Sequence, residues 1–126
     1  MKKEHSESST RDNIHNFEAQ FKKSTTQLLV LYLLSKREMY AYDIIRETLS
    51  LSNNVYRMPL IYNLLDKLEA DTYITQSRRE ISDNNRVRIY YKITEKGVQY
   101  LNELTDSYVR LSDSVNKILF GKEENQ

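Results

Sequence analysis

The segment from Arg86 to Gly97 limits the possible folds of this chain more than any other part of the sequence. Its first eight residues alternate strictly, as in a β-strand that is buried on one face only. The side chains expected to face a core are Val87, Ile89, Tyr91 and Ile93, and those expected to face outward are Arg86, Arg88, Tyr90 and Lys92. Thr94 then stands in the position of a helix N-cap, and the residues after it have a helical pattern. A strand with a basic outer face therefore leads directly into a long helix.

The residues before this strand predict helices and one hairpin. Ile14, Phe17 and Phe21 indicate a short amphipathic helix. The sequence Ser-Thr-Thr-Gln at residues 24–27 has the form of a capping box, which predicts that a new helix begins there. That helix would bury the apolar run at residues 28–34, and it would be followed by a second amphipathic helix near residues 40–49.

The middle of the chain predicts a loop, a third helix and the first strand of the hairpin. Residues 50–54 read as a loop, and residues 55 and 56 as a very short strand. Pro59 suits the first turn of a helix, which would end near residue 71 or 72. Residues 74–79 predict a strand, and Ser-Asp-Asn-Asn at 82–85 predicts the turn to the strand that opened this section.

The last helix shows the heptad spacing of a coiled-coil seam, with apolar residues three and four positions apart. We expect it to pair with the same helix of a second copy, because two-fold dimers are the commonest oligomers. Packing of the seam on the chain's own first helix is the alternative, and a dimer could bury both helices together. The residues expected in this interface are Phe17, Phe21, Leu101, Leu104, Tyr108, Leu111, Val115 and Ile118.

This order of elements predicts a mainly α (α+β) protein built on a winged helix-turn-helix. It has an extra N-terminal helix and a long C-terminal dimerisation helix. The expected divisions are a disordered N-terminal tail at 1–11, the winged helix-turn-helix with its N-terminal helix at 12–93, the dimerisation helix at 94–121 and a disordered tail at 122–126.

In this architecture the third helix and the hairpin, or wing, contact DNA. Asn63 can pair with adenine, and Lys67 can reach a guanine edge or a phosphate. The residues expected at a DNA interface are Arg57, Pro59, Leu60, Tyr62, Asn63, Lys67, Arg78, Arg79, Arg86 and Arg88. The alternatives are an ordinary solvated helix face and an edge hairpin whose charges prevent aggregation. Two arginines on each strand of a chain with a net charge of +1 favour DNA.

The composition gives little support to catalysis or to a cofactor. The chain has no cysteine, its two histidines lie near the N-terminus, and it contains no recognisable catalytic, phosphate-binding or metal-binding motif. No apolar run approaches the roughly 20 residues that span a bilayer, so we expect a cytoplasmic protein without a membrane partner. Five tyrosines are candidates for an effector pocket, and the alternative for each is an amphipathic core residue with its hydroxyl at the edge: Tyr32, Tyr40, Tyr42, Tyr100 and Tyr108.

Four segments in order resemble the PadR family of bacterial transcriptional regulators. They are the apolar helix at 27–34, Tyr-Ala-Tyr-Asp-Ile at 40–44, the third helix at 61–69 and the strand with its Thr-Glu-x-Gly exit at 86–97. The resemblance implies a dimeric regulator, typically a repressor, that is released by a phenolic acid or a drug-like compound. The single terminal helix is similar to that of the family's short subgroup, in which it carries dimerisation.

The chain departs from the family pattern at several positions. Ala41 stands where the family usually has glycine, and Thr72 where it usually has a helix-ending glycine. Leu60 replaces a frequent threonine, and Asp66 a frequent basic residue. Some short members of the family use a tryptophan to stack a drug, but this chain has no tryptophan.

Two functions therefore compete. The first is a homodimeric repressor that binds a palindromic operator on double-stranded DNA and responds to a small aromatic or drug-like effector. The second is a winged-helix protein-interaction module that has lost specific DNA binding, which Leu60 and Asp66 favour.

Overall fold

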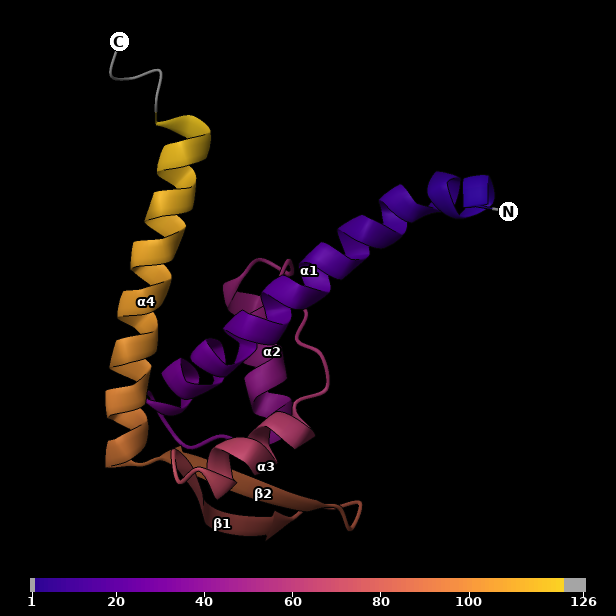
Figure 1. Ribbon diagram of the computed structural model, residues 1–126. Coiled ribbons are helices and arrows are strands. Elements are labelled where there is room, and N and C mark those ends of the chain that lie inside the picture. Colours follow the sequence, from indigo (N-terminus) through magenta and orange to yellow (C-terminus); the bar gives the residue numbers. More distant parts are fainter. Residues whose placement is uncertain (1, 122–126) are drawn as a thin grey trace.

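A computed structural model describes residues 2–121, with side chains from residue 9 onward. The elements follow the order α1 (Lys2–Leu34), α2 (Ala41–Leu51), α3 (Tyr62–Ala70), β1 (Ile74–Ile81), β2 (Val87–Ile93) and α4 (Glu95–Phe120). In Figure 1, α2, α3 and the hairpin gather around the C-terminal end of α1. The N-terminal half of α1 and the C-terminal half of α4 extend away from this unit as two separate arms. The winged helix-turn-helix predicted from the sequence is confirmed, including the long last helix.

The hydrophobic core joins all the helices to the hairpin. Val30 and Leu31 of α1, Ile44 of α2 and Ile61 before α3 are fully buried. Ile74 of β1 and Leu101 of α4 belong to the same cluster. Because α4 contributes Leu101 near its beginning, its first turns belong to the domain, and its later turns leave it.

The first helix is continuous, and the predicted new start at residue 24 is wrong. The hydroxyl groups that suggested a capping box donate to carbonyls of the preceding turn. Ser24 Oγ and Thr25 Oγ1 donate to the carbonyl of Phe21 at 3.0 and 2.8 Å, and Thr26 Oγ1 donates to that of Lys22 at 2.6 Å. Serine and threonine inside a helix commonly make this bond, so the same residue types serve both arrangements.

Residues 2–11 are part of α1, so the disordered tail expected there is also wrong. This stretch contains neither glycine nor proline, and extending an existing helix costs little compared with starting one. The apolar run at 28–34, anchored in the core, provides the existing helix. Met1 and the tail expected at 122–126 lie outside the described residues.

The loop between α2 and α3 differs from its prediction at two points. Residues 55 and 56 form no strand, and α3 begins at Tyr62 rather than at Pro59. The first hydrogen bond of α3 runs from the Leu65 amide to the Ile61 carbonyl at 2.8 Å. Burial of Met58 and Ile61 holds the intervening residues outside the helix.

The hairpin is antiparallel and contains a β-bulge. Gln76 pairs with Tyr91 and Arg78 pairs with Tyr90, so Ser77 has no partner of its own. The isolated bridge of Met39 to Tyr91 adds a third backbone segment beside β2. A bulge increases the local twist and changes which side chains a strand presents.

The predicted division of β2 into a buried and an outer face is only partly correct. Tyr90 was expected to point outward but is 8% exposed, because its ring packs against Tyr40 at a centroid distance of 5.2 Å. Val87 was expected in the core but is 56% exposed, since the hairpin extends beyond the helices at that point.

The junction between the wing and α4 follows the prediction closely. Thr94 is the N-cap of α4, and its Oγ1 accepts a hydrogen bond from the Gly97 amide at 3.0 Å. The same hydroxyl lies within donating distance of two carbonyls, those of Thr72 at 2.7 Å and Tyr73 at 3.1 Å. The start of α4 is thereby tied to the end of α3.

Candidate nucleic-acid interface

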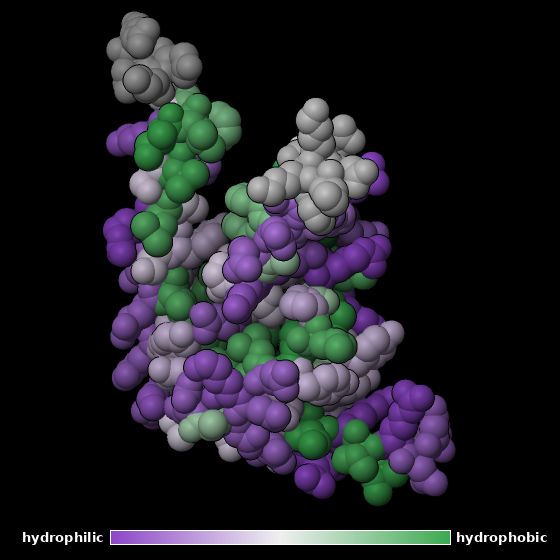
Figure 2. Space-filling model, turned by 45° about the vertical axis from the view of Figure 1, so that its right-hand side comes forward, coloured by the Kyte–Doolittle hydropathy of each residue, from purple (hydrophilic) through white to green (hydrophobic). Residues whose placement is uncertain are grey.

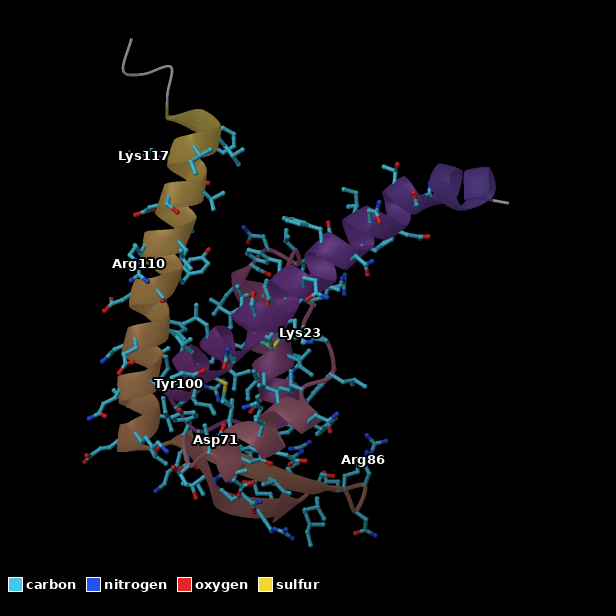
Figure 3. The ribbon with its side chains drawn as sticks, viewed as in Figure 1. Lys23, Asp71, Arg86, Tyr100, Arg110 and Lys117 are labelled. Carbon is cyan, nitrogen blue, oxygen red and sulfur yellow. The ribbon has the colours of Figure 1, made fainter. Side chains whose placement is uncertain are left out.

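The beginning of α3 and the turn of the hairpin lie on the same side of the molecule, away from α4 (Figure 1). Arg86 marks the tip of the wing on this side, and Asp71 marks the opposite end of α3 (Figure 3). A cleft of about 500 Å³ separates α3 from the wing and is closed at its base by the start of α2. Its polar and aromatic lining includes Tyr40, Tyr42, Arg46, Tyr62, Arg86 and Arg88.

The outward face of α3 contains the residues that the sequence assigned to it. Leu65 and Leu68 are buried, whereas Tyr62, Asn63 and Lys67 are exposed. Lys67 Nζ forms an ion pair with Asp71 at 3.2 Å, with both side chains largely in solvent. Exposed pairs of this kind contribute about 0–1 kcal/mol, so Lys67 can exchange its partner for a phosphate.

The loop before α3 presents three further predicted residues. Arg57, Pro59 and Leu60 are all exposed, and Leu60 is 83% exposed. Among the ion pairs formed by the described residues, none involves Arg57. Arg57 is therefore an exposed cation that forms no ion pair within the described part of the chain, and it lies just before α3.

Arg78 is on the wing, but its charge is already neutralised. Its guanidinium forms ion pairs with Glu80 and, at 3.2 Å, with Glu38, and it lies 3.7 Å from the centre of the Tyr90 ring. The hydrogen bond to Glu80 raises the pKa of Arg78, and it lowers the pKa of Glu80 below its ordinary value of 4.5. Arg78 thus has a structural role in the wing that the sequence did not reveal.

The other three wing arginines differ in how free they are. Arg88 lies over the ring of Tyr40, with 4.9 Å between the guanidinium carbon and the ring centre. Arg86 and Arg79 are exposed, and neither takes part in an ion pair among residues 9–121. Arg79 pairs with Ile89 across the hairpin, so the two side chains share a face.

Arg46 and Tyr42 of α2 are also close to the predicted interface, although the sequence did not point to them. Both line the cleft opposite the wing. Arg46 pairs with Asp43 at 2.6 Å, and its guanidinium carbon lies 4.8 Å from the centre of the Tyr42 ring. The only signal in the sequence was the i,i+3 spacing of Asp43 and Arg46, which is common on solvated helices.

The predicted interface between two copies divides into a buried and an exposed part. Leu101 is buried in the chain's own core, and Leu104 packs against it. Farther along α4, Tyr108, Leu111, Val115 and Ile118 are 43–74% exposed, and Figure 2 shows apolar surface at that end of the helix. Phe17 and Phe21 on α1 are 69% and 45% exposed.

The five tyrosines considered for an effector pocket do not gather at one place. Tyr40 and Tyr42 line the cleft beside the wing. Tyr100 stacks on Tyr73 with ring centres 4.1 Å apart and donates to Gln27 Oε1 at 2.9 Å. Tyr32 lies beneath Lys36, and Tyr108 is on the outer part of α4.

A second cavity, of about 320 Å³, lies between α1 and the loop before α3. Its apolar and aromatic lining consists of Phe17, Phe21, Val55 and Tyr56, and Glu18 and Lys22 add one charge of each sign. The Tyr56 hydroxyl is 2.7 and 2.9 Å from the hydroxyls of Thr25 and Thr26. This cavity therefore adjoins a hydrogen-bonded link between α1 and the loop.

No helix within residues 2–121 combines the length and apolar character that crossing a membrane requires. The same residues contain no group of three histidine or acidic side chains placed to hold a metal ion.

Comparison with known proteins gives consistent relatives. The model of the transcriptional regulator PadR-like family matches residues 30–103. A PadR-like transcriptional regulator from Bacillus cereus is 28% identical, with a TM-score of 0.67 over 82% of this chain and 99% of that one. A PadR-like transcription factor from Bacteroides fragilis is 32% identical, with a TM-score of 0.63 over 82% of this chain and 98% of that one. An uncharacterised protein from Lysinibacillus sphaericus is 27% identical over 97 residues, which is 75% of this chain and 88% of that protein.

Proposed function

Because this chain belongs to the PadR-like family of transcriptional regulators, we propose that it is a homodimeric repressor that binds a palindromic operator. The observation that carries the proposal is the cleft between α3 and the wing, which Arg46, Arg86 and Arg88 line together with Tyr62, the neighbour of the exposed Asn63. In a winged helix-turn-helix we expect the recognition helix to enter the major groove and the wing to lie on the neighbouring backbone. Asn63 is the residue that we expect to read adenine.

The apolar part of α4 supports pairing of two copies. Leu111, Val115 and Ile118 are exposed at intervals of four and three residues, and they lie beyond the part of α4 that packs on its own domain. Two such helices packed together would place two copies of α3 on one face of the dimer. A two-fold dimer of this kind requires an operator with two-fold symmetry.

A titration of labelled DNA from the chain's own promoter region, followed by fluorescence anisotropy, tests the proposal. We expect sequence-selective binding that weakens steeply with salt, because cationic side chains displace counterions from DNA. Arg86→Ala should weaken binding and reduce the salt slope by about one. Arg110→Ala is the matched control, since Arg110 is exposed on α4, remote from the cleft (Figure 3).

The outcome also separates the two functions that the sequence left open. A protein that stays dimeric but shows no selective binding would favour the protein-interaction module. Selective binding that is unaffected by Arg86→Ala would support a DNA-binding regulator but would show that Arg86 of the wing does not contact the DNA.

We place the effector in the cavity between α1 and the loop before α3. Its aromatic lining suits a small aromatic molecule, and Lys22, which lines the cavity together with Glu18, can pair with a carboxylate. Phenolic acids titrated into the protein–DNA complex should release the DNA, and Phe21→Ala should weaken that response. If such acids do not release the DNA, the proposed effector site is wrong, whereas the proposed DNA binding is not affected by that result. We expect the regulator to act in the cytoplasm, where its operator is.

A further inference from the structure

Leu60 is an exposed aliphatic side chain at the expected DNA interface, where most of the other residues are cationic or polar. At 83% exposed, it is the most exposed of the large hydrophobic residues in the described part of the chain. Burying a leucine side chain gains about 1.5–3 kcal/mol, and in the free protein this gain is not realised. Leu60 also lies outside the exposed seam on α4 and outside the linings of the two cavities described above.

The backbone on each side of Leu60 is anchored, so the side chain is held outward. Met58 is 9% exposed and Ile61 is fully buried, which pins the chain two residues before Leu60 and one residue after it. Pro59 restricts the backbone between them. A contact made by Leu60 therefore orders little that is not ordered already, and ordering is a main cost of binding.

The position of Leu60 points to the floor of the major groove. It directly precedes Ile61, the N-cap of α3, and Asn63 follows within the first turn of the helix. In a helix-turn-helix the N-terminal residues of the recognition helix approach the base edges. The thymine C5-methyl is the apolar group that these edges present there.

We propose that Leu60 packs on a thymine methyl group and makes this chain selective for thymine beside the adenine that Asn63 reads. The inference rests on the proposed function, because it specifies part of the operator for that same interface.

Replacing thymines by deoxyuridine in the operator tests this directly, because deoxyuridine removes the methyl and keeps the base pairing. We expect the wild-type protein to bind about three- to tenfold more weakly when one particular thymine in each half-site is replaced. Leu60→Ala should bind the thymine and deoxyuridine operators equally well. Leu51→Ala is the matched control, since Leu51 is also exposed and ends α2, so it should keep the full sensitivity.

Two results would overturn the inference while leaving the proposed function intact. One is selective binding that is indifferent to every thymine methyl. The other is a Leu60→Ala variant that remains as sensitive to deoxyuridine as the wild type. Absence of selective binding to any DNA would instead overturn the proposed function and this inference with it.

Discussion

In the substitution Gly97→Ala, the higher helix propensity of alanine opposes a steric overlap between its Cβ and the Tyr73 carbonyl. Gly97 is the third residue of α4, and alanine inside a helix is favoured over glycine by about 1 kcal/mol. A Cβ at this position, however, would overlap the carbonyl oxygen of Tyr73 and lie 2.7 Å from Cγ1 of Ile93. A backbone carbonyl cannot rotate away as a side chain can, so the first turn of α4 would have to move.

The displaced carbonyl accepts a backbone hydrogen bond that holds the junction together. The Thr94 amide donates to it at 3.0 Å, whereas the Thr94 hydroxyl lies closer to the Thr72 carbonyl. One hydrogen bond at about 0.5–1.5 kcal/mol, with about 1–3 kcal/mol for overpacking, outweighs the gain in helix propensity. We expect the free energy of unfolding to fall by about 0.5–3.5 kcal/mol.

Urea unfolding followed by circular dichroism, at one protein concentration, measures this change as a shift in midpoint at constant slope. Gly121→Ala is the matched control, because its Cβ would be 3.0 Å from the Lys117 carbonyl at the free end of α4. We expect that variant to differ from the wild type by no more than about 0.5 kcal/mol. Equal or greater stability of Gly97→Ala would refute the close approach of α4 to Tyr73.

Three other predictions follow from the same structure. Thr72 ends α3 with a φ of 65°, which is unfavourable for a β-branched residue, so Thr72→Gly should raise the unfolding free energy by about 0.5–1 kcal/mol, and a urea midpoint that falls would contradict this. Leu111→Glu should convert the proposed dimer to monomer in analytical ultracentrifugation, whereas Val109→Glu, on another face of α4, should not; equal behaviour of the two would exclude the seam. Because the hydrogen bond from Arg78 lowers the pKa of Glu80, the ion pair between them contributes to stability above the ordinary pKa of 4.5. This contribution should be lost only as the pH falls through the lowered pKa. An NMR titration that gives Glu80 its ordinary pKa would disprove the contact.

Local signals predicted the junction at residues 94–97 well, because its determinants are close together in the chain. The N-cap hydroxyl of Thr94 and the amide it accepts from belong to residues three apart. Long-range contacts explain what was missed. Arg78 meets Glu38, which is 40 positions earlier, and no periodicity in the hairpin could reveal this neutralisation.

The same reasoning applies to the candidate interface. The exposed face of α3 followed from the spacing of its buried leucines, so Asn63 and Lys67 were placed correctly. The cleft opposite the wing depends on how α2 packs, which the sequence does not encode locally, so Arg46 was missed. The bulge at Ser77 has no marker such as glycine, and the burial of Tyr90 depends on Tyr40, which lies 50 positions earlier.

Because α1 is one continuous helix, a movement of its exposed half is transmitted to its buried half. A helix of 33 residues is about 50 Å long, and this one has no hinge between its exposed half and the half that is buried in the core. Tyr56, whose hydroxyl is hydrogen-bonded to Thr25 and Thr26 in the C-terminal half of α1, belongs to the loop that carries Leu60 and leads into α3. A molecule that tilts the exposed half of α1 would therefore also move this loop and the start of α3.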